Sequence, residues 1–522
     1  MAATDDVFKK IVSHCKEYGF VFPASEIYDG PGAVYDYGPY GAQLRNHIKE
    51  YWWKSMVQMH ENIVGIDAAI FMHPTTWKAS GHVDAFNDPL VDNKDSKKRY
   101  RADVLIEDYI AKLEDKIGKE AEKGRKKFGE AFDEVQFKAT HPQASKWHKE
   151  AIEVNDRLQA AMRDKDMPAL KQIIEDCQIA DPESGSRNWT EVRQFNLMFS
   201  TQLGNIAGEE GKLYLRPETA QGIFVNFLNV QKTTRQKLPF GIAQIGKAFR
   251  NEIVARQFIF RMREFEQMEM QFFIKPGDEM QWYNYWKKMR LAWHRAIGAP
   301  ADKLRFHDHE NLAHYANAAV DIQFDFPFGF KEIEGIHSRT DFDLSQHQKY
   351  SGKKMTYFDP ESNESYVPYV VETSIGLDRM FLATMSRAYT EDIVPDADGK
   401  ESSRVVLKLH PALAPVKCAI LPLLKNDDRL TSKAEAIFNE LKYSFNCQYD
   451  EKDAIGRRYR RQDAIGTPYC VTIDHDTLTD HMVTVRDRDT LRQDRVSIDQ
   501  VAKIISEKVD INNVLREIEK LA

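Results

Sequence analysis

Alternation of polar and apolar positions predicts a hairpin of two strands between residues 240 and 274. Successive side chains of a strand point to opposite faces, so every second residue shares a face. One face of this hairpin would carry arginines, carboxylates and an aromatic ring: Gln244, Gly246, Ala248, Arg250 and Glu252, then Arg261, Arg263, Phe265, Gln267, Glu269 and Gln271. Buried charges need partners, so this is not a core face. The pattern fits either a solvated hairpin with cross-strand ion pairs or a binding surface.

The N-terminal pattern predicts a short helix at 5–18, a turn-rich connection at 28–44 and a second helix from 44. Apolar residues at helical spacing form a stripe on the second helix: Leu44, Ile48, Trp52, Met56 and Met59. This stripe fits a core helix and an interface helix equally well. Alternation over 66–72 then predicts a strand that Pro74 ends.

Residues 104–185 differ from the rest, because apolar positions at helical spacing stand among many charges. We expect a helical insertion whose charge runs form a solvated face. We find no catalytic signature in it.

From residue 190 onward strands dominate, and a helix over 279–297 carries three tryptophans. Strands at 304–307 and 319–326 follow, and a strand runs into a helix over 369–389. Three prolines in 407–424 indicate a boundary near 412, giving a catalytic domain at 1–412 and a small α/β domain at 413–522. The expected order in the second domain is strand 416–423, helix 431–445, strand 446–450, helix 453–466, strands 469–474, 482–486 and 494–498, and helix 499–508.

Composition bounds the function. The 522 residues are 42% hydrophobic and 29% charged, as in soluble globular proteins, and a net charge of −7 confines any nucleic-acid contact to local patches. The five cysteines are scattered without a CxxC pair, so we expect a reducing compartment and no zinc. The N-terminus has no apolar leader and no run approaches the ~18 apolar residues of a membrane span. We therefore expect a cytoplasmic protein without a membrane partner.

Four stretches combine fixed cations with carboxylates: 216–219, 249–252 with 260–269, 331–335 and 372–379. Arginine binds phosphate through its planar fork, and nucleotidyl transfer needs mainly positioning and charge neutralisation. Mg²⁺ would sit on one or two carboxylates and phosphate oxygens. The sequence has no P-loop and no GxGxxG motif after a strand. An ATP site would therefore use an antiparallel sheet with arginine clamps.

Together these stretches resemble the class II aminoacyl-tRNA synthetases, and within them the homodimeric glycyl-tRNA synthetase family. The helix, strand and Pro74 are similar to the first class II motif, which builds the dimer interface. FRNE with REFEQMEMQFF is similar to the second motif, and ETSIGLDRMFLA to the third. RPETAQGIF, KRYRAD and EIEGIHSRTDFDL resemble glycyl-specific segments, although RADV stands where RADH is expected. The resemblance covers nearly the whole chain, and least clearly the insertion.

The resemblance implies an α+β catalytic domain on an antiparallel six-to-seven-stranded sheet flanked by helices, with a helical insertion and a C-terminal α/β anticodon-binding domain. It implies that ATP and glycine form glycyl-adenylate, which charges the 3′ end of glycine tRNA, with Mg²⁺ as cofactor and a homodimer formed through 43–74. Two alternatives stay open: a class II synthetase of another specificity, such as threonyl, prolyl or histidyl, and a tRNA-binding paralogue without ligase activity.

The resemblance also implies site residues. Arg250, Arg379 and Glu332 would be catalytic, with Arg250 on the α-phosphate and the glycine carboxylate, and Glu332 on Mg²⁺. ATP would contact Arg250, Asn251, Glu252, Phe260, Arg261, Met262, Arg263, Glu264, Phe265, Glu332, Ile333, Gly376, Leu377, Asp378 and Arg379. Glycine would contact Arg101, Glu218, Phe265, Glu266, Gln267, Met268, Glu269, Glu372, Thr373, Ser374, Ile375 and Gly376.

Chemistry supports part of this set. Glycine offers an ammonium, a carboxylate and no side chain, so recognition needs carboxylates and a small cavity. Glu218, Glu269 and Glu372 supply the carboxylates. In the C-terminal domain Arg457, Arg458, Tyr459 and Arg461 form a basic stretch that fits either a solvated helix face or a tRNA contact. Histidines such as His73, His82 and His337 receive no role.

Overall fold

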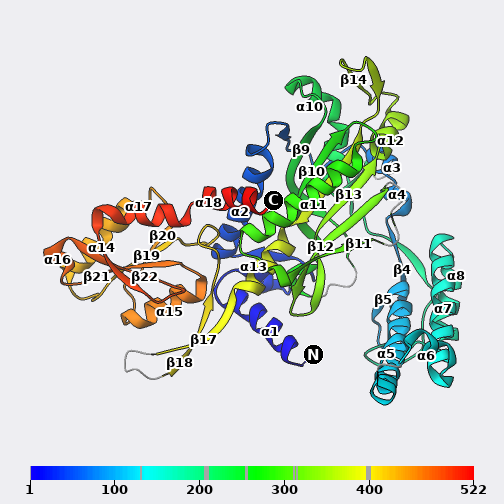
Figure 1. The fold of residues 1–522 in the computed structure, drawn as a ribbon, viewed down its shortest axis with the longest axis horizontal. Coiled ribbons are helices and arrows are strands. Elements are labelled where there is room, and N and C mark those ends of the chain that lie inside the picture. Colours follow the sequence, from blue (N-terminus) through cyan, green and yellow to red (C-terminus); the bar gives the residue numbers. More distant parts are fainter. Residues whose placement is uncertain are drawn as a thin grey trace. The chain divides into compact units, whose positions relative to one another are not determined.

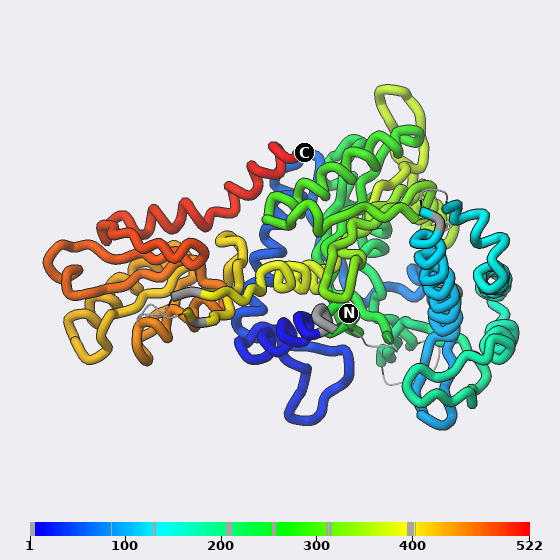
Figure 2. The backbone as a smooth tube through the Cα atoms, turned by 60° about the horizontal axis from the view of Figure 1, so that its bottom comes forward, coloured from blue at the N-terminus to red at the C-terminus, as the bar shows by residue number. Residues whose placement is uncertain are grey.

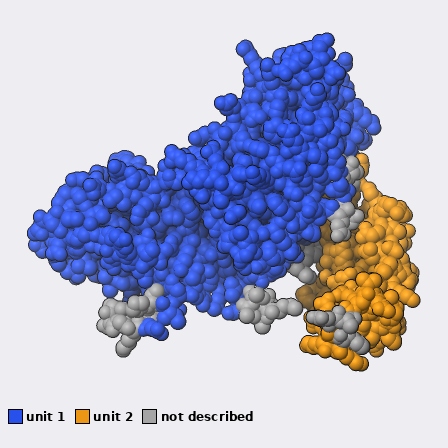
Figure 3. Space-filling model, viewed as in Figure 1, with its two compact units in different colours: residues 1–80, 200–249, 257–522 blue, residues 81–199, 250–256 orange. Residues whose placement is uncertain are grey.

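The computed structural model describes residues 2–129, 132–204, 211–252, 257–309, 312, 316–395 and 401–522. It divides into two compact units (Figure 3). The first comprises residues 1–80, 200–249 and 257–522, and the second comprises residues 81–199 and 250–256.

A seven-stranded sheet organises the first unit (Figure 1). Its strands, in spatial order, are β11 Leu304–Asp308, β12 Ala318–Phe326, β13 Gly329–Thr340, β16 Tyr369–Gly376, β10 Glu264–Ile274, β9 Phe240–Phe249 and β3 Ile63–Gly65. Neighbours are antiparallel except β3, which runs parallel to β9. The predicted α+β catalytic fold is thereby confirmed.

The first predicted strand was misplaced, because β3 ends at Gly65, where a strand over 66–72 was expected. Beyond it the backbone leaves the ladder: the Ala68 amide donates to the Gln244 side-chain oxygen at 2.6 Å. A side chain of β9 thus takes the hydrogen bond that a longer strand would have given to the backbone.

The predicted hairpin is present as β9 and β10, paired so that Glu269 lies opposite Gln244 and Phe265 opposite Ala248. The strands are shorter than the alternation suggested. Arg250 and Glu252 follow the end of β9, and Arg261 and Arg263 precede β10. Their placement on the hairpin face, inferred from period-2 spacing, is therefore wrong, since that spacing holds only within a strand.

The even-numbered residues of β10 face the main core, where Met268, Met270 and Phe272 are buried. Helices α2 Pro39–Trp53, α11 Glu279–Ala296 and α13 Leu377–Ala388 supply the apolar side chains that pack there. The stripe of α2 belongs to this core, because Leu44, Ile48 and Trp52 are fully buried in it, as is Met56 in the π-helical turn that follows. The stripe itself is therefore a core feature.

The remaining elements of the catalytic part surround this sheet. They are α1 Ala2–Glu17, β1 Val21–Pro23, η1 Glu26–Tyr28, β2 Tyr35–Tyr37, η2 Lys54–Gln58, α3 Pro74–Ala79, β7 Ser200–Gln202, β8 Lys212–Tyr214, α9 Ala220–Val225, α10 Phe227–Thr234, η5 Phe258–Phe260, η6 Ala301–Lys303, α12 Phe342–Ser351, β14 Tyr357–Asp359, β15 Glu364–Tyr366, β17 Tyr389–Pro395 and β18 Glu401–Leu407. On the opposite face of the sheet, Phe224 and Phe227 cover Phe240 and Phe273. Polar residues occupy the part of that face between the apolar cover and the strand ends.

A five-stranded mixed sheet forms the C-terminal α/β part, in the order β20-β19-β21-β22-β23. Its elements follow the predicted order closely: β19 Cys418–Pro422, α14 Asp428–Leu441, β20 Cys447–Tyr449, α15 Ile455–Ile465, β21 Tyr469–Ile473, α16 Thr477–Asp480, β22 Met482–Asp487, β23 Gln493–Ser497, α17 Ile498–Val509 and α18 Ile511–Leu521. The last helix leaves this sheet and lies beside α11, where Val514, Leu515 and Ile518 join the main core (Figure 1).

The second unit combines helices with a small sheet, ordered β5-β4-β6. Its elements are α4 His82–Ala85, β4 Asn87–Asp92, β5 Arg99–Arg101, α5 Ala102–Phe128, α6 Glu134–Thr140, α7 Pro142–Arg163, α8 Met167–Asp176 and β6 Arg193–Asn196. Helices α5 and α7 pack side by side (Figure 2). Exposed pairs such as Lys119–Asp115 support the prediction of a solvated charged face. The unit is longer than the predicted 104–185, because its strands lie on both sides of that segment.

Within the described part of the chain, none of the helices has the length and apolar character needed to span a membrane.

Candidate active site

Three central strands of the large sheet carry polar side chains on one face. In the register of these strands Glu269 of β10 lies opposite Ser374 of β16, and Gln271 lies opposite Glu372. His337 of β13 lies on the other side of Glu372. Because side chains on one face of paired residues are neighbours, this register places two carboxylates, an amide and an imidazole together.

A single amide links the two carboxylates: Nε2 of Gln271 donates to Oε1 of Glu269 and to Oε2 of Glu372, each at 2.7 Å. The Thr219 hydroxyl, at the start of α9, also donates to Glu269. Glu372 accepts from Nδ1 of His337 at 2.7 Å and from Nη1 of Arg339 at 3.1 Å. The pair is thus bound into one network.

Glu218, the third predicted carboxylate, is connected to this network through Gln221 of α9. Glu218 accepts from Nε2 of Gln221 at 3.0 Å, and the same nitrogen donates to Asp343 at 3.0 Å. Asp343 holds the Arg339 guanidinium with two hydrogen bonds, of 2.8 and 3.0 Å. The predicted trio Glu218, Glu269 and Glu372 therefore does come together in the fold.

The surroundings of Glu269 and Glu372 shift the pKa values of these two carboxyl groups in opposite directions. Burial raises the pKa of Glu269 well above its usual value, and the neighbouring Glu372 and Glu218 raise it further. Burial alone would also raise the pKa of Glu372, but the Arg339 guanidinium and the His337 imidazole lower it below its ordinary range. The two carboxyl groups of the pair therefore differ in acidity, and Glu269 holds its proton more strongly than Glu372 does.

The predicted nucleotide side lies at the start of α13. Nη1 of Arg379 forms an ion pair of 2.9 Å with Oε2 of Glu332, and its guanidinium stacks 4.5 Å from the centre of the Phe260 ring. The Glu332 side chain is 46% exposed. An arginine, a carboxylate and a ring are thus assembled, as the resemblance implies for ATP.

Several predicted site residues belong to the second unit. The Arg250 guanidinium lies 5.4 Å from the centre of the Phe86 ring, and the Asn251 amide donates to the Leu197 carbonyl at 2.7 Å. Arg101 pairs with Asp103 at 2.5 Å and with Asp88 at 3.2 Å. The roles predicted for Arg101, Arg250, Asn251 and Glu252 stay predictions.

Four members of the predicted glycine set face the other side of the sheet. Met268 and Ile375 are buried in the main core, and Thr373 shares their face. Glu266 pairs instead with Arg45 of α2 at 2.8 Å. These side chains were included because they lie within the motifs, but strand alternation directs them away from the ligand face. We do not propose side-chain contacts to glycine for them.

The predicted ATP set needs the same correction. Asp378 is buried, accepts from the Tyr37 hydroxyl at 2.5 Å and lies 3.2 Å from Arg45, so it anchors the core. The core also buries Met262, Ile333 and Leu377. Burial raises the pKa of Asp378, against the lowering effect of Arg45. None of these four side chains is proposed to contact ATP.

Other members of the predicted ATP set lie near the start of β10. Glu264 pairs with Lys247 across the hairpin, and Nη1 of Arg263 donates to the Gly32 carbonyl at 3.1 Å. Arg261 is exposed just before β10. Their predicted contacts with ATP stay predictions.

Sequence reasoning missed several residues that bond to Glu269 and Glu372. Gln271 was placed on the correct face without a role, while Thr219, His337 and Arg339 received none. Only strand pairing brings His337 and Arg339 to Glu372, across more than thirty residues of sequence. The alternation of His337 with Arg339, which both lie in β13, was the one signal that could have grouped them.

The residues of the basic stretch 457–461 in the C-terminal domain differ in burial and in their partners. Arg458 is 1% exposed, and its guanidinium donates to the carbonyls of Pro422 at 2.5 Å and Leu423 at 3.0 Å. Arg461 is held by Asp450 and Asp453, at 2.8 and 2.7 Å. The Tyr459 hydroxyl bonds to Thr472 at 2.6 Å. Arg458 is therefore structural and not proposed as a tRNA contact.

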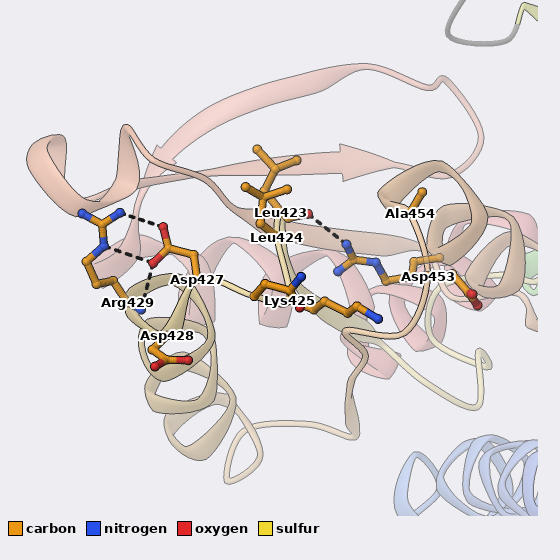
Figure 4. Close-up of a pocket in the computed structure, with 10 residues that line it drawn as sticks. Leu423, Leu424, Lys425, Asp427, Asp428, Arg429, Asp453 and Ala454 are labelled. Atoms are coloured by element: carbon orange, nitrogen blue, oxygen red, sulfur yellow. Dashed lines mark hydrogen bonds and ion pairs between the residues drawn. The ribbon is translucent and has the colours of Figure 1, made fainter.

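A pocket of this domain adjoins the buried arginine, and is lined by 423–429, 453, 454 and 458 (Figure 4). Asp427 and Arg429 pair at 2.7 Å on one side, and Asp453 and Ala454 lie on the other. Its lining mixes charged side chains with the apolar Leu423, Leu424 and Ala454.

This antiparallel sheet with its arginine–carboxylate site is that of a class II aminoacyl-tRNA synthetase, and residues 203–388 match the family model of the tRNA synthetase class II core domain (G, H, P, S and T). Residues 88–197 match the glycyl-tRNA synthetase insertion domain 1, and residues 417–508 match the anticodon binding domain. The chain belongs to the glycine–tRNA ligase family. It is 52% identical to the glycine–tRNA ligase of Chlorobaculum tepidum over 96% of this chain and 99% of that protein. Glycine–tRNA ligases of Staphylococcus haemolyticus and Staphylococcus aureus are 49% and 48% identical, over 96% and 95% of this chain and 98% of each relative.

Proposed function

We propose that this protein is a glycine–tRNA ligase, which activates glycine with ATP and transfers it to the 3′ end of glycine tRNA. The main observation that supports this proposal is the carboxylate pair Glu269–Glu372, which the Gln271 amide links across adjacent strands. An amino acid without a side chain is recognised mainly through its ammonium group, and a carboxylate pair fits that charge. The identity with relatives named glycine–tRNA ligase supports the same assignment.

Glu372 and Glu269 would have different roles in binding glycine. Glu372 already accepts hydrogen bonds from Arg339, His337 and Gln271, so it would supply a fixed negative charge beside the bound glycine. Glu269 is the member with the raised pKa, and an incoming ammonium would favour its ionised form. Glycine binding would thus complete the charge balance of a site that is preorganised without it.

The nucleotide would lie toward α13. Arg379 would contact the distal phosphates, with Arg250 on the α-phosphate, where positive charge stabilises the in-line displacement. Mg²⁺ prefers carboxylate and phosphate oxygens, and the exposed carboxylate of Glu332 beside Arg379 fits such a cation. Phe265, at the entrance of the same face, would stack on adenine.

The remaining partners follow from the family. The C-terminal domain would contact the tRNA, with Arg457 exposed on α15 near the pocket of that domain. We propose a homodimer formed through the helix–strand region 43–74, acting in the cytoplasm. Sedimentation of the purified chain tests the dimer: a monomer at micromolar concentration would contradict it.

Charging of tRNA tests the function. Glycine tRNA should accept radiolabelled glycine in the presence of ATP and Mg²⁺, whereas threonine, proline and histidine tRNAs should not accept their own amino acids. Charging with one of these would establish another class II specificity. Binding of tRNA without charging by any amino acid would establish a paralogue that lacks ligase activity.

A further inference from the structure

Three strands at the edge of the large sheet bring together two imidazoles and a carboxylate. His309 follows β11 directly, Asp321 lies in β12 and His337 in β13. One potential ligand atom from each residue lies within 4.8 Å of the other two. Nε2 of His309 is 3.0 Å from Oδ1 of Asp321. None of these residues belongs to the predicted ATP or glycine sets.

We propose that His309, Asp321 and His337 bind a divalent first-row transition metal ion, with zinc as the representative case. Two imidazoles and one carboxylate form a recurrent protein ligand set for such ions, which leaves further positions to water. Ligand atoms about 2.1 Å from a tetrahedral ion are about 3.4 Å apart. The His309–Asp321 spacing of 3.0 Å is close to this value, and a shift of these two side chains toward Nε2 of His337 would close the remaining gap while His337 keeps its hydrogen bond to Glu372.

The backbone beneath the cluster leaves room for an ion. Gly335 lies directly opposite Asp321 in the register of β12 and β13. A Cβ at this position would come within 3.2 Å of His337 Nε2 and 3.8 Å of Asp321 Oδ1. Nε2 and Oδ1 therefore face the same space above Gly335, and that space exists because residue 335 has no side chain.

His337 is also oriented as a metal ligand would be. Its Nδ1 donates to Oε1 of Glu372 at 2.7 Å, and because a carboxylate only accepts, the proton lies on Nδ1. In the neutral ring the lone pair then lies on Nε2, which faces the same space as Oδ1 of Asp321. Such a carboxylate partner fixes the tautomer and raises the basicity of ligating histidines.

The ligand chemistry separates this site from the one proposed for Mg²⁺. Magnesium prefers oxygen ligands, as Glu332 and phosphate would provide, whereas imidazole selects zinc, cobalt and related ions. The expectation of no zinc rested on the scattered cysteines, and this cluster uses none. The inference rests on the strand geometry and does not depend on the proposed ligase activity.

Cobalt and zinc binding by the full-length chain tests the proposal. After treatment with a chelator, the protein should bind one equivalent of Co²⁺ with visible ligand-field absorption, and Zn²⁺ should displace it while millimolar Mg²⁺ should not. His309→Ala and Asp321→Asn should each weaken Co²⁺ binding beyond the about 10–100-fold typical of losing an outer-shell partner. Both substitutions leave Glu372 and its direct hydrogen-bond donors in place, and equal melting temperatures in chelator would show that the fold is intact.

His307→Ala is the matched control, since this histidine lies two residues away on β11 outside the cluster. It should bind cobalt as the wild type does. The proposal is overturned if the wild type binds no cobalt, if Mg²⁺ competes at equal concentration, or if the His309→Ala, Asp321→Asn double variant retains wild-type affinity. In those cases the three side chains form only a hydrogen-bonded cluster.

Discussion

Glu269 and Glu372 lie on adjacent strands and share a hydrogen-bond donor, the Gln271 amide, at 2.7 Å from each. Arg339 and His337 approach only Glu372, and Thr219 approaches Glu269. Two chemically identical groups therefore differ in pKa because of their neighbours: Arg339 and His337 lower the pKa of Glu372, whereas burial and nearby carboxylates raise that of Glu269.

Glycine affinity should depend on pH through Glu269. Burial raises its pKa in the free protein, so below that pKa a bound ammonium must first displace a proton. Glycine should bind more tightly as pH rises toward the raised pKa of Glu269, with a proton released on binding. Calorimetry in buffers of different ionisation enthalpy measures this release. Proton release by Glu269→Gln equal to that of the wild type would assign the effect to another group.

Glu269→Gln should also weaken glycine recognition directly. A hydrogen bond to a charged group contributes about 1.5–3 kcal/mol, so KM for glycine in pyrophosphate exchange should rise about 10–100-fold, with KM for ATP nearly unchanged. Glu364→Gln, at an exposed carboxylate of β15, is the control and should match the wild type. A parallel rise in both KM values would indicate a structural role for Glu269.

Arg250→Ala should abolish formation of the adenylate, because no other side chain is proposed to neutralise the α-phosphate. The predicted loss is at least 100-fold in the exchange rate, the scale of removing one preorganised electrostatic contact. Lys247→Ala removes a nearby exposed cation that pairs with Glu264, and should have little effect. Near-normal exchange by Arg250→Ala would place the α-phosphate clamp elsewhere.

Local patterns in the sequence predicted the fold more completely than the site. Alternation located β9 and β10, and in the C-terminal part it gave every strand in order, because each pattern is decided by residues close in the chain. Alternation failed at Arg250, because β9 ends before it. Motif membership failed at Asp378, which is buried against Arg45 of α2. Motif membership grouped Glu266 with Glu269, although alternation directs them to opposite faces. The contacts of His337 and Arg339 with Glu372 arise from strand order, which no local pattern contains.

Lys417 should make stability rise with pH. The residue is 7% exposed and donates to the Ala412 carbonyl at 2.7 Å, and burial lowers its pKa to about 7 from 10.5. Below pH 7 the folded state must hold a buried charge, and this cost disappears as pH rises from 7 toward 10.5. Relative to Lys417→Met, the melting temperature of the wild type should increase between pH 7 and 9. Parallel curves for the two proteins would contradict the assignment.

Two adjacent arginines of α15 should behave differently. Arg457→Ala, at an exposed position, should weaken tRNA charging while pyrophosphate exchange, which needs no tRNA, continues. Arg458→Ala removes the donor to the Pro422 and Leu423 carbonyls, so it should lower the melting temperature of the C-terminal domain by several degrees. Calorimetric melting and charging assays on both variants separate the roles. Destabilisation by Arg457→Ala of the same size would show that its charging defect is indirect.

The central claim is that this site activates glycine, and amino-acid-dependent exchange of pyrophosphate into ATP tests it most directly. With each of the twenty amino acids supplied alone, the full-length protein should exchange pyrophosphate with glycine and with none of the others. Exchange driven by a different amino acid, or no exchange with any, would contradict the claim.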